Sequence, residues 1–198
     1  MIQNGATVGV LGFDTAAAAQ AAFVAPGALV DNVLCFLAGT LIGTPDGQVE
    51  VERLSPGDRV RTAGGAVRPV AWIGHGRVLA TRGRRGPATP VIVRKGALGP
   101  NVPHTDLHVT KGHALWFDGV LIPVEFLVNH RTILWDDRAR EVEIYHVELE
   151  SHDVLIANGA PAESFRDDGN RWLFQNARSG WHLPPQEPWA SMPNTGIW

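Results

Sequence analysis

From Cys35 onward the chain consists of short apolar segments separated by turn-forming residues, and this pattern limits the possible folds most strongly. The segments CFLAGTLIGT (35–44) and GQVEVERL (47–54) meet at the turn sequence TPDG, and TPVIVRKGAL (89–98) contains Pro and Gly near its ends. Short runs rich in Val, Ile and Thr and bounded by Gly, Pro and Asp are typical of β-strands and hairpins. Few windows show the spacing of apolar residues that a helix needs. We therefore predict a mainly β fold, and 198 residues are enough to bury a proper core.

Two parts of the chain resemble each other. GTLIGTPDGQVEVERL (39–54) and GHALWFDGVLIPVEFL (112–127) share a Gly, an apolar strand, an Asp-Gly turn and a second strand that ends in Glu-x-Leu. This repeat predicts a pseudo-twofold array of β-hairpins, in which the strands that follow the two glycines face each other. It also predicts that the strands near Cys35 and His113 lie close to one symmetric centre.

The ends of the chain differ from the β-rich middle. Residues 1–34 contain a short predicted helix at Asp14–Phe23, and residues 166–198 are rich in Trp and Pro. We therefore predict a short N-terminal segment (1–34), a β domain (35–165) and a C-terminal tail (166–198) that wraps the surface or extends away from it.

Charge and hydropathy exclude several partners. Lys and Arg number 17 against 20 Asp and Glu, a net charge of −3, which argues against a nucleic-acid partner. The densest basic stretch, Arg77–Arg85, is predicted to be a solvated loop. The N-terminus lacks the basic region of a secretory signal, and no apolar run approaches the ~18 residues that a membrane span needs. We expect a soluble chain with no membrane partner, and the sequence does not indicate its compartment.

Cys35 is the only cysteine, so the fold contains no internal disulfide. A free cysteine is often a small buried hydrophobic residue. However, Cys35 lies where the composition changes, and the small residues Ala38 and Gly39 follow it, so that the backbone can approach closely. A thiol with a pKa of ~8.5 needs a histidine or a positive neighbour to act as a nucleophile at neutral pH. Cys35 is therefore either a core residue or a nucleophile with a distant base.

Eight histidines are candidates for that base. His104, His108 and His113 are close in sequence, and a zinc site is the alternative reading of this group. On a strand, His104 and His108 share a face while His113 takes the other face, which argues against a shared metal. His146 and His152 would also lie on one face of a strand. A structural or solvent-exposed role is the simplest expectation for both.

Three ordered blocks of sequence are similar to the Hint superfamily, which contains the self-processing domains of Hedgehog proteins and inteins. CFLAGTLIGTPDG with VERLSPGDRV resembles the first block, in which a Cys opens a strand. VTKGH (109–113) resembles the Thr-x-x-His block, and YHVELESHDVLIANG (145–159) resembles the late block. The endings of bacterial Hint domains are similar to HDVLIANGAPAESF (152–165). The resemblance covers Cys35 to Phe165 and implies the Hint fold.

The resemblance also implies a chemistry. The Cys35 thiol attacks the carbonyl of Leu34 and replaces the Leu34–Cys35 amide with a thioester. His113 is the implied proton donor to the leaving nitrogen, and Thr110 orients or polarises the peptide. The substrate is then the chain's own N-terminal segment, and we expect no cofactor and no metal.

The chain departs from the intein pattern at its end. Glu163 and Ser164 stand where inteins have His-Asn, and Phe165 follows where a nucleophile is needed, so splicing is not expected. Water or a small external nucleophile is expected to resolve the thioester. An intein commonly has Asp or Cys at the position of His146, which makes His146 a second candidate base or donor and leaves His152 a weaker one.

Two other functions compete with self-cleavage. The domain could be an inactive Hint-fold module with a binding or structural role, whose Trp-rich tail forms a contact surface. It could also be a cysteine hydrolase that uses Cys35 and His113 on other molecules.

Overall fold

The computed structural model describes residues 33–80, 84–167 and 171–177. The predicted helix at Asp14–Phe23 lies outside these residues. The first seven strands are β1 (Phe36–Leu37), β2 (Leu41–Thr44), β3 (Gly47–Glu50), β4 (Arg59–Arg61), β5 (Val67–Leu79), β6 (Pro90–Val93) and β7 (Leu107–Thr110). The other six are β8 (Ala114–Phe117), β9 (Val120–Pro123), β10 (Ile133–Trp135), β11 (Glu141–Leu149), β12 (Val154–Ala157) and β13 (Ala160–Glu163). The described helices are 3-10 turns: η1 (Val51–Arg53), η2 (Val124–Leu127) and η3 (Arg171–Leu173).

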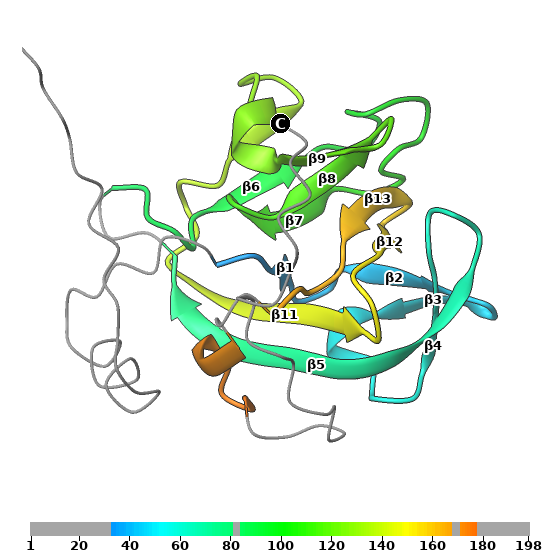
Figure 1. Cartoon of the computed structure of the whole chain (residues 1–198). Coiled ribbons are helices and arrows are strands. Elements are labelled where there is room, and N and C mark those ends of the chain that lie inside the picture. Colours follow the sequence, from blue (N-terminus) through cyan, green and yellow to red (C-terminus); the bar gives the residue numbers. More distant parts are fainter. Residues whose placement is uncertain (1–32, 81–83, 168–170, 178–198) are drawn as a thin grey trace, which may run out of the picture.

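The strands form two antiparallel sheets (Figure 1). One has seven strands in the order β10-β6-β7-β1-β11-β5-β4, and the other has six in the order β3-β2-β12-β13-β8-β9. The prediction of a mainly β fold is therefore confirmed. Within the described ranges, no helix is long and apolar enough to cross a membrane.

Tight turns fix the register of the hairpins. Phe117 pairs with Val120 across a turn in which Asp118 and Gly119 have φ values of 44° and 92°. Positive φ at both central residues is what a two-residue hairpin turn needs, and Asp-Gly adopts it at low cost. The TPDG turn predicted from the sequence likewise connects β2 to β3, and only the end of that second segment differs, because 51–53 form η1.

The repeat seen in the sequence has a structural counterpart. The hairpins β2-β3 and β8-β9 flank the central hairpin β12-β13, and each is followed by a 3-10 turn. The backbone bond from Val51 to the carbonyl of Thr40 (2.8 Å) has its equivalent in the bond from Val124 to the carbonyl of His113 (3.0 Å). Thr40 and His113 therefore occupy corresponding positions in the two halves, as the pseudo-twofold prediction requires.

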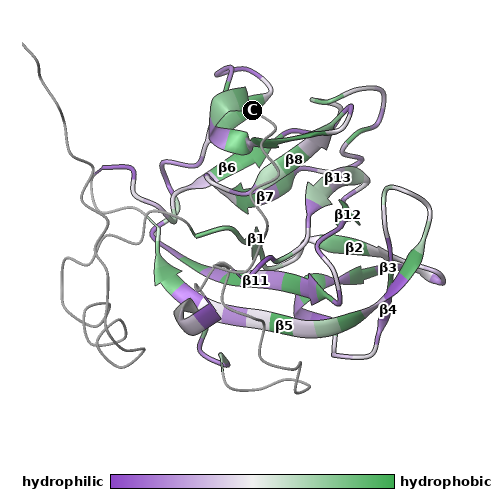
Figure 2. Ribbon diagram, viewed as in Figure 1, coloured by the Kyte–Doolittle hydropathy of each residue, from purple (hydrophilic) through white to green (hydrophobic). Residues whose placement is uncertain are grey.

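Strand β1 runs between the two halves of the large sheet. Phe36 is opposite Tyr145 of β11 on one side and Val109 of β7 on the other. The ribbon of β1 is coloured as hydrophobic in Figure 2, and both of its residues are buried. The short strand that follows Cys35 is therefore held by pairing on both edges.

A second core cluster lies on the Cys35 side of the sheet and includes part of the C-terminal region. Residues 171–177, which we call the C-terminal clasp, lie against β5 (Figure 1). The Phe174 ring packs edge-on against Trp72 at 5.2 Å, and the Arg171 guanidinium lies 4.0 Å above the Trp72 ring. Arg171 also pairs with the buried Glu148 carboxylate at 2.6 Å. The chain after Phe165 thus contributes a side chain to the core.

Gly74 of β5 makes room for this packing. A Cβ atom at Gly74 would lie 2.4 Å from the Trp72 ring and 2.7 Å from the Phe174 ring. Only glycine lets both rings approach the strand this closely.

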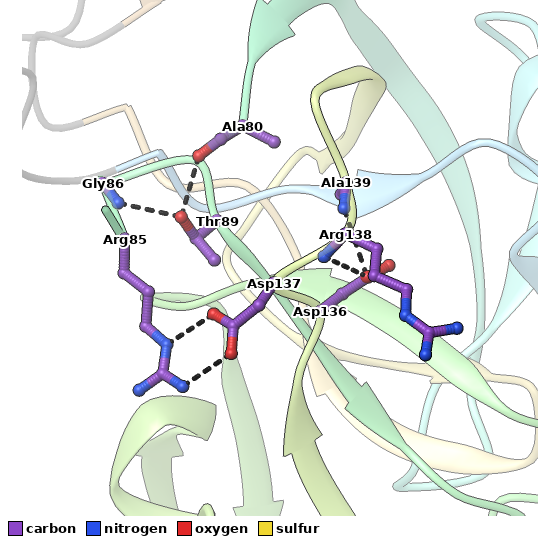
Figure 3. A network of polar contacts seen from close by, with 8 residues as sticks. All are labelled: Ala80, Arg85, Gly86, Thr89, Asp136, Asp137, Arg138 and Ala139. Atoms are coloured by element: carbon purple, nitrogen blue, oxygen red, sulfur yellow. Dashed lines mark hydrogen bonds and ion pairs between the residues drawn. The ribbon is translucent and has the colours of Figure 1, made fainter. Parts of the chain in front are cut away.

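The expectation of a solvated loop at Arg77–Arg85 is wrong at its start, because β5 extends to Leu79. Arg77 pairs with Glu143 of the neighbouring strand at 2.5 Å. Arg85 forms a two-pronged pair with Asp137, at 2.7 Å and 2.8 Å, next to the bonds that Thr89 makes with Gly86 and Ala80 (Figure 3). Both arginines are exposed but neutralised by carboxylates, and residues 81–83 lie outside the described part of the chain.

Candidate functional site

Thr110 holds the peptide that precedes Cys35. The Cys35 N–H donates to the Thr110 hydroxyl oxygen at 2.8 Å, and the Thr110 hydroxyl donates to the carbonyl of Val33. The Thr110 N–H donates to the Cys35 carbonyl at 2.9 Å. A single residue at the end of β7 thus contacts the backbone on both sides of Leu34. The Thr110 hydroxyl oxygen therefore accepts a hydrogen bond from the nitrogen of the Leu34–Cys35 amide.

The Cys35 thiol is buried in the second core cluster. Cys35 is fully buried, and the cluster also contains Val33, Trp72, Ile144, Phe165 and Phe174. Burial raises the pKa of the Cys35 thiol well above its usual value, because a thiolate is poorly solvated there. At neutral pH the resting group is therefore the protonated thiol, and an attack by its sulfur needs a base.

Two buried histidines lie together beside β1. The ring centroids of His113 and His146 are 5.2 Å apart, and the Phe36 ring lies 4.3 Å from that of His113. Burial lowers the pKa of His113 to about 4 and that of His146 to about 3. At pH 7 both rings are neutral, so each is able to accept a proton.

These two rings are incompletely hydrogen-bonded. Among the described residues, neither ring nitrogen of His113 has a partner, and Nδ1 of His146 also lacks one. The backbones of Leu34 and Ser164 lie near enough to the His146 ring to favour its protonated form. Most buried polar groups are paired, so unpaired imidazole nitrogens call for an explanation, and a catalytic role provides one.

Glu163, at the end of β13, is a residue of this site that the sequence did not single out as functional. Its Oε1 accepts from the Ala114 N–H at 2.6 Å, and Oε2 lies 3.8 Å from Nε2 of His152. Burial pushes the pKa of Glu163 upward, but the neighbouring side chains of His152 and His113 and the Ala114 N–H outweigh burial and lower it. The side chain is therefore a buried carboxylate beside the histidine pair. The only signal in the sequence was that Glu replaces the His of the intein ending.

The other histidines lie elsewhere. His104 contacts Gln48 at 2.7 Å, and His108 lies on β7 opposite Ile92 of β6. Thus His104, His108 and His113 do not converge, and no three potential ligands come together in the described part of the chain. Among the described residues, His152 is linked to the site through its contact with Glu163.

The predicted site residues thus come together from four separate parts of the chain. Cys35 and the peptide before it precede β1, Thr110 ends β7, His113 precedes β8 and His146 lies on β11. The arrangement contains a nucleophile, an adjacent carbonyl and two neutral bases in a buried setting, which is what an internal acyl transfer needs.

Comparison with protein families identifies the domain. A family model described as the Hint domain matches residues 34–169. The chain belongs to the Hint domain family. The match begins one residue before Cys35, so it includes both partners of the Leu34–Cys35 bond.

Several solved intein structures are similar to this chain. A variant of the MchDnaB-1 intein is 17% identical with a TM-score of 0.47, and the match covers 66% of this chain and 99% of the intein. The gp41-1 intein is 13% identical with a TM-score of 0.47, over 65% of this chain and 96% of the intein. A bacterial intein-like domain from Clostridium thermocellum is 16% identical with a TM-score of 0.46, over 67% and 100%. No curated protein matches the chain.

Proposed function

We propose that this Hint domain cleaves its own chain at the Leu34–Cys35 bond and does not splice. The observation that carries the proposal is the bond between the Cys35 N–H and the Thr110 hydroxyl, together with the fully buried Cys35 side chain. The peptide to be broken is held at its nitrogen. The nucleophile is the side chain of the same residue, so the sulfur and the Leu34 carbonyl are already close and lose little entropy when they align.

The reaction has two steps. The Cys35 sulfur bonds to the Leu34 carbonyl carbon, the carbon–nitrogen bond breaks, and the thiol proton passes to the released nitrogen through the neutral His113–His146 pair. Water or a small nucleophile then bonds to the carbonyl carbon of Leu34, the carbon–sulfur bond breaks, and the sulfur regains a proton. The products are a segment that ends at Leu34 and a domain that begins with Cys35.

The end of the described domain supports cleavage without splicing. Glu163 and Ser164 stand at the positions where inteins have His-Asn, and neither side chain can cyclise as asparagine does. The Ser164 hydroxyl accepts from the Asp153 N–H at 2.9 Å, and the Phe165 N–H donates to the carbonyl of Val147 at 2.7 Å. Hydrogen bonds thus hold Ser164 and Phe165 against neighbouring segments of the domain.

Intact-mass measurement of the purified chain tests the proposal. The chain is incubated at pH 7 with buffer alone, with dithiothreitol or with hydroxylamine. We expect both nucleophiles to accelerate the appearance of a fragment that begins at Cys35. Hydroxylamine should leave a hydroxamate on the segment that ends at Leu34, because it attacks a thioester far faster than an amide. A wild-type mass that stays constant in all three conditions contradicts the proposal and favours the inactive-module alternative.

Thr110→Val tests the role of the hydroxyl. Valine has nearly the same shape but leaves the Cys35 N–H and the Val33 carbonyl without their side-chain partner. We expect nucleophile-dependent cleavage to slow by about 10- to 100-fold, since a buried hydrogen bond to a reacting group contributes on the order of 1–3 kcal/mol. Thr110→Ser, which keeps the hydroxyl, should remain within a few-fold of the wild-type rate. Equal rates for the valine variant and the wild type would show that the hydroxyl does not act on this bond.

A further inference from the structure

We propose that Glu163 is a positioning residue whose negative charge stabilises the protonated form of the His113–His146 pair during cleavage. This inference rests on the proposed function and extends it to a residue to which the family resemblance gave no catalytic role.

The backbone places the Glu163 carboxylate next to the pair. The Ala114 N–H that binds Oε1 belongs to the residue after His113, so this bond fixes the carboxylate at the start of β8. Strand β13 pairs with β8 at Ala162 and Leu115, which holds the two segments in register. With a side chain that is 11% exposed, Glu163 is largely shielded from water. Its interaction with nearby charge is therefore screened less than on a surface.

Few charged groups face the histidine pair. For His113, burial opposes protonation and Glu163 favours it. For His146, burial and the charge of His113 oppose protonation, while Glu163 and the backbones of Ser164 and Leu34 favour it. Glu163 is thus the one side chain of the described residues that favours protonation of both rings. The Cys35 thiol adds no charge at rest, because burial raises its pKa.

The cleavage step creates a need for such a charge. When a neutral imidazole takes the thiol proton, a positive charge forms in a buried site, and that charge exists only until the proton reaches the leaving nitrogen. A fixed carboxylate lowers the energy of this transient imidazolium without acting on the substrate itself. Nε2 of His152, whose side chain is 27% exposed, lies 3.8 Å from Oε2 of this carboxylate.

Glu163→Gln is the matched test, because glutamine keeps the shape and the acceptor for the Ala114 N–H but removes the charge. We expect nucleophile-dependent cleavage at pH 7 to slow by about 10-fold or more, with the rate restored to within a few-fold of wild type in Glu163→Asp. Glu148→Gln removes a different buried carboxylate, one that pairs with Arg171, and is the control. The proposal is overturned if Glu163→Gln cleaves at the wild-type rate or slows no more than Glu148→Gln.

A second measurement is independent of cleavage. In a Cys35→Ala background, the ring signals of His113 and His146 are followed by NMR during acid titration. The loss of a nearby anion should move the midpoints of both titrations to lower pH in Glu163→Gln and leave them in place in Glu148→Gln. If wild-type chain never cleaves but these midpoints move, the proposed function fails while the electrostatic role of Glu163 stands. Unmoved midpoints in Glu163→Gln contradict the role directly.

Discussion

Replacing Cys35 with alanine is expected to abolish the fragment that begins at residue 35, in buffer and with either nucleophile. The thiol is the only cysteine sulfur in the chain, and its residue carries the amide nitrogen that Thr110 binds. Without the sulfur no thioester forms, and direct attack on an unactivated amide is too slow to observe. Intact mass after prolonged incubation with hydroxylamine measures the result.

Cys35→Ser is a milder change that keeps a nucleophile at this position. A hydroxyl is a much weaker nucleophile than a thiol, so the serine variant should cleave on the order of 10²-fold more slowly than wild type. Thermal unfolding of the wild type and the two variants should show that each substitution lowers the free energy of unfolding by only about 1 kcal/mol, the effect of losing a small buried group. Fragment from Cys35→Ala at the wild-type rate would place the nucleophile elsewhere, as in contaminating proteolysis.

Replacing Trp72 with alanine is expected to lower the free energy of unfolding by about 3–5 kcal/mol, the typical cost of removing a large buried aromatic side chain. Trp72 is 1% exposed and contacts Phe165, Phe174 and Arg171. Its indole nitrogen has no hydrogen-bond partner among the described residues, so the loss arises from packing. Urea unfolding followed by far-ultraviolet circular dichroism measures the change.

Two further variants separate this effect from a general sensitivity to lost aromatic rings. Phe126→Ala removes a ring that is 75% exposed and should change stability by less than about 0.5 kcal/mol. Phe174→Ala removes the part of the C-terminal clasp that contacts Trp72, so its effect should not add fully to that of Trp72→Ala. Full additivity would mean that the clasp and Trp72 contribute independently.

The sequence predicted the hairpins well because their signals are local. The turns at 44–47 and at Asp118–Gly119 need particular backbone angles that only a few residue types adopt easily. A short stretch of sequence is therefore enough to predict each turn. The internal repeat then indicated the symmetric arrangement of β2-β3 and β8-β9. The boundary at Phe165 was less informative, because a tail rich in Trp and Pro does not show from its own sequence that Phe174 enters the core.

The site was predicted in part. Cys35, Thr110, His113 and His146 came from the order of the sequence blocks, and the structure brings all four to the region around β1. Their catalytic roles stay predictions. Glu163 was noted only as a departure from the intein ending, because nothing near it in sequence reveals that its carboxylate binds Ala114, 49 residues away.

Most of the strands, the turns, the repeat and the position of the single cysteine could be predicted from the sequence, since each depends on residues that are neighbours along the chain. Three features became visible only in the folded chain: the bond of Thr110 to the Cys35 nitrogen across 75 residues, the neutrality of the two histidines, and the carboxylate beside them. Hydrogen bonds and pKa values depend on which distant groups share a buried environment, and that environment exists only once the sheets have packed.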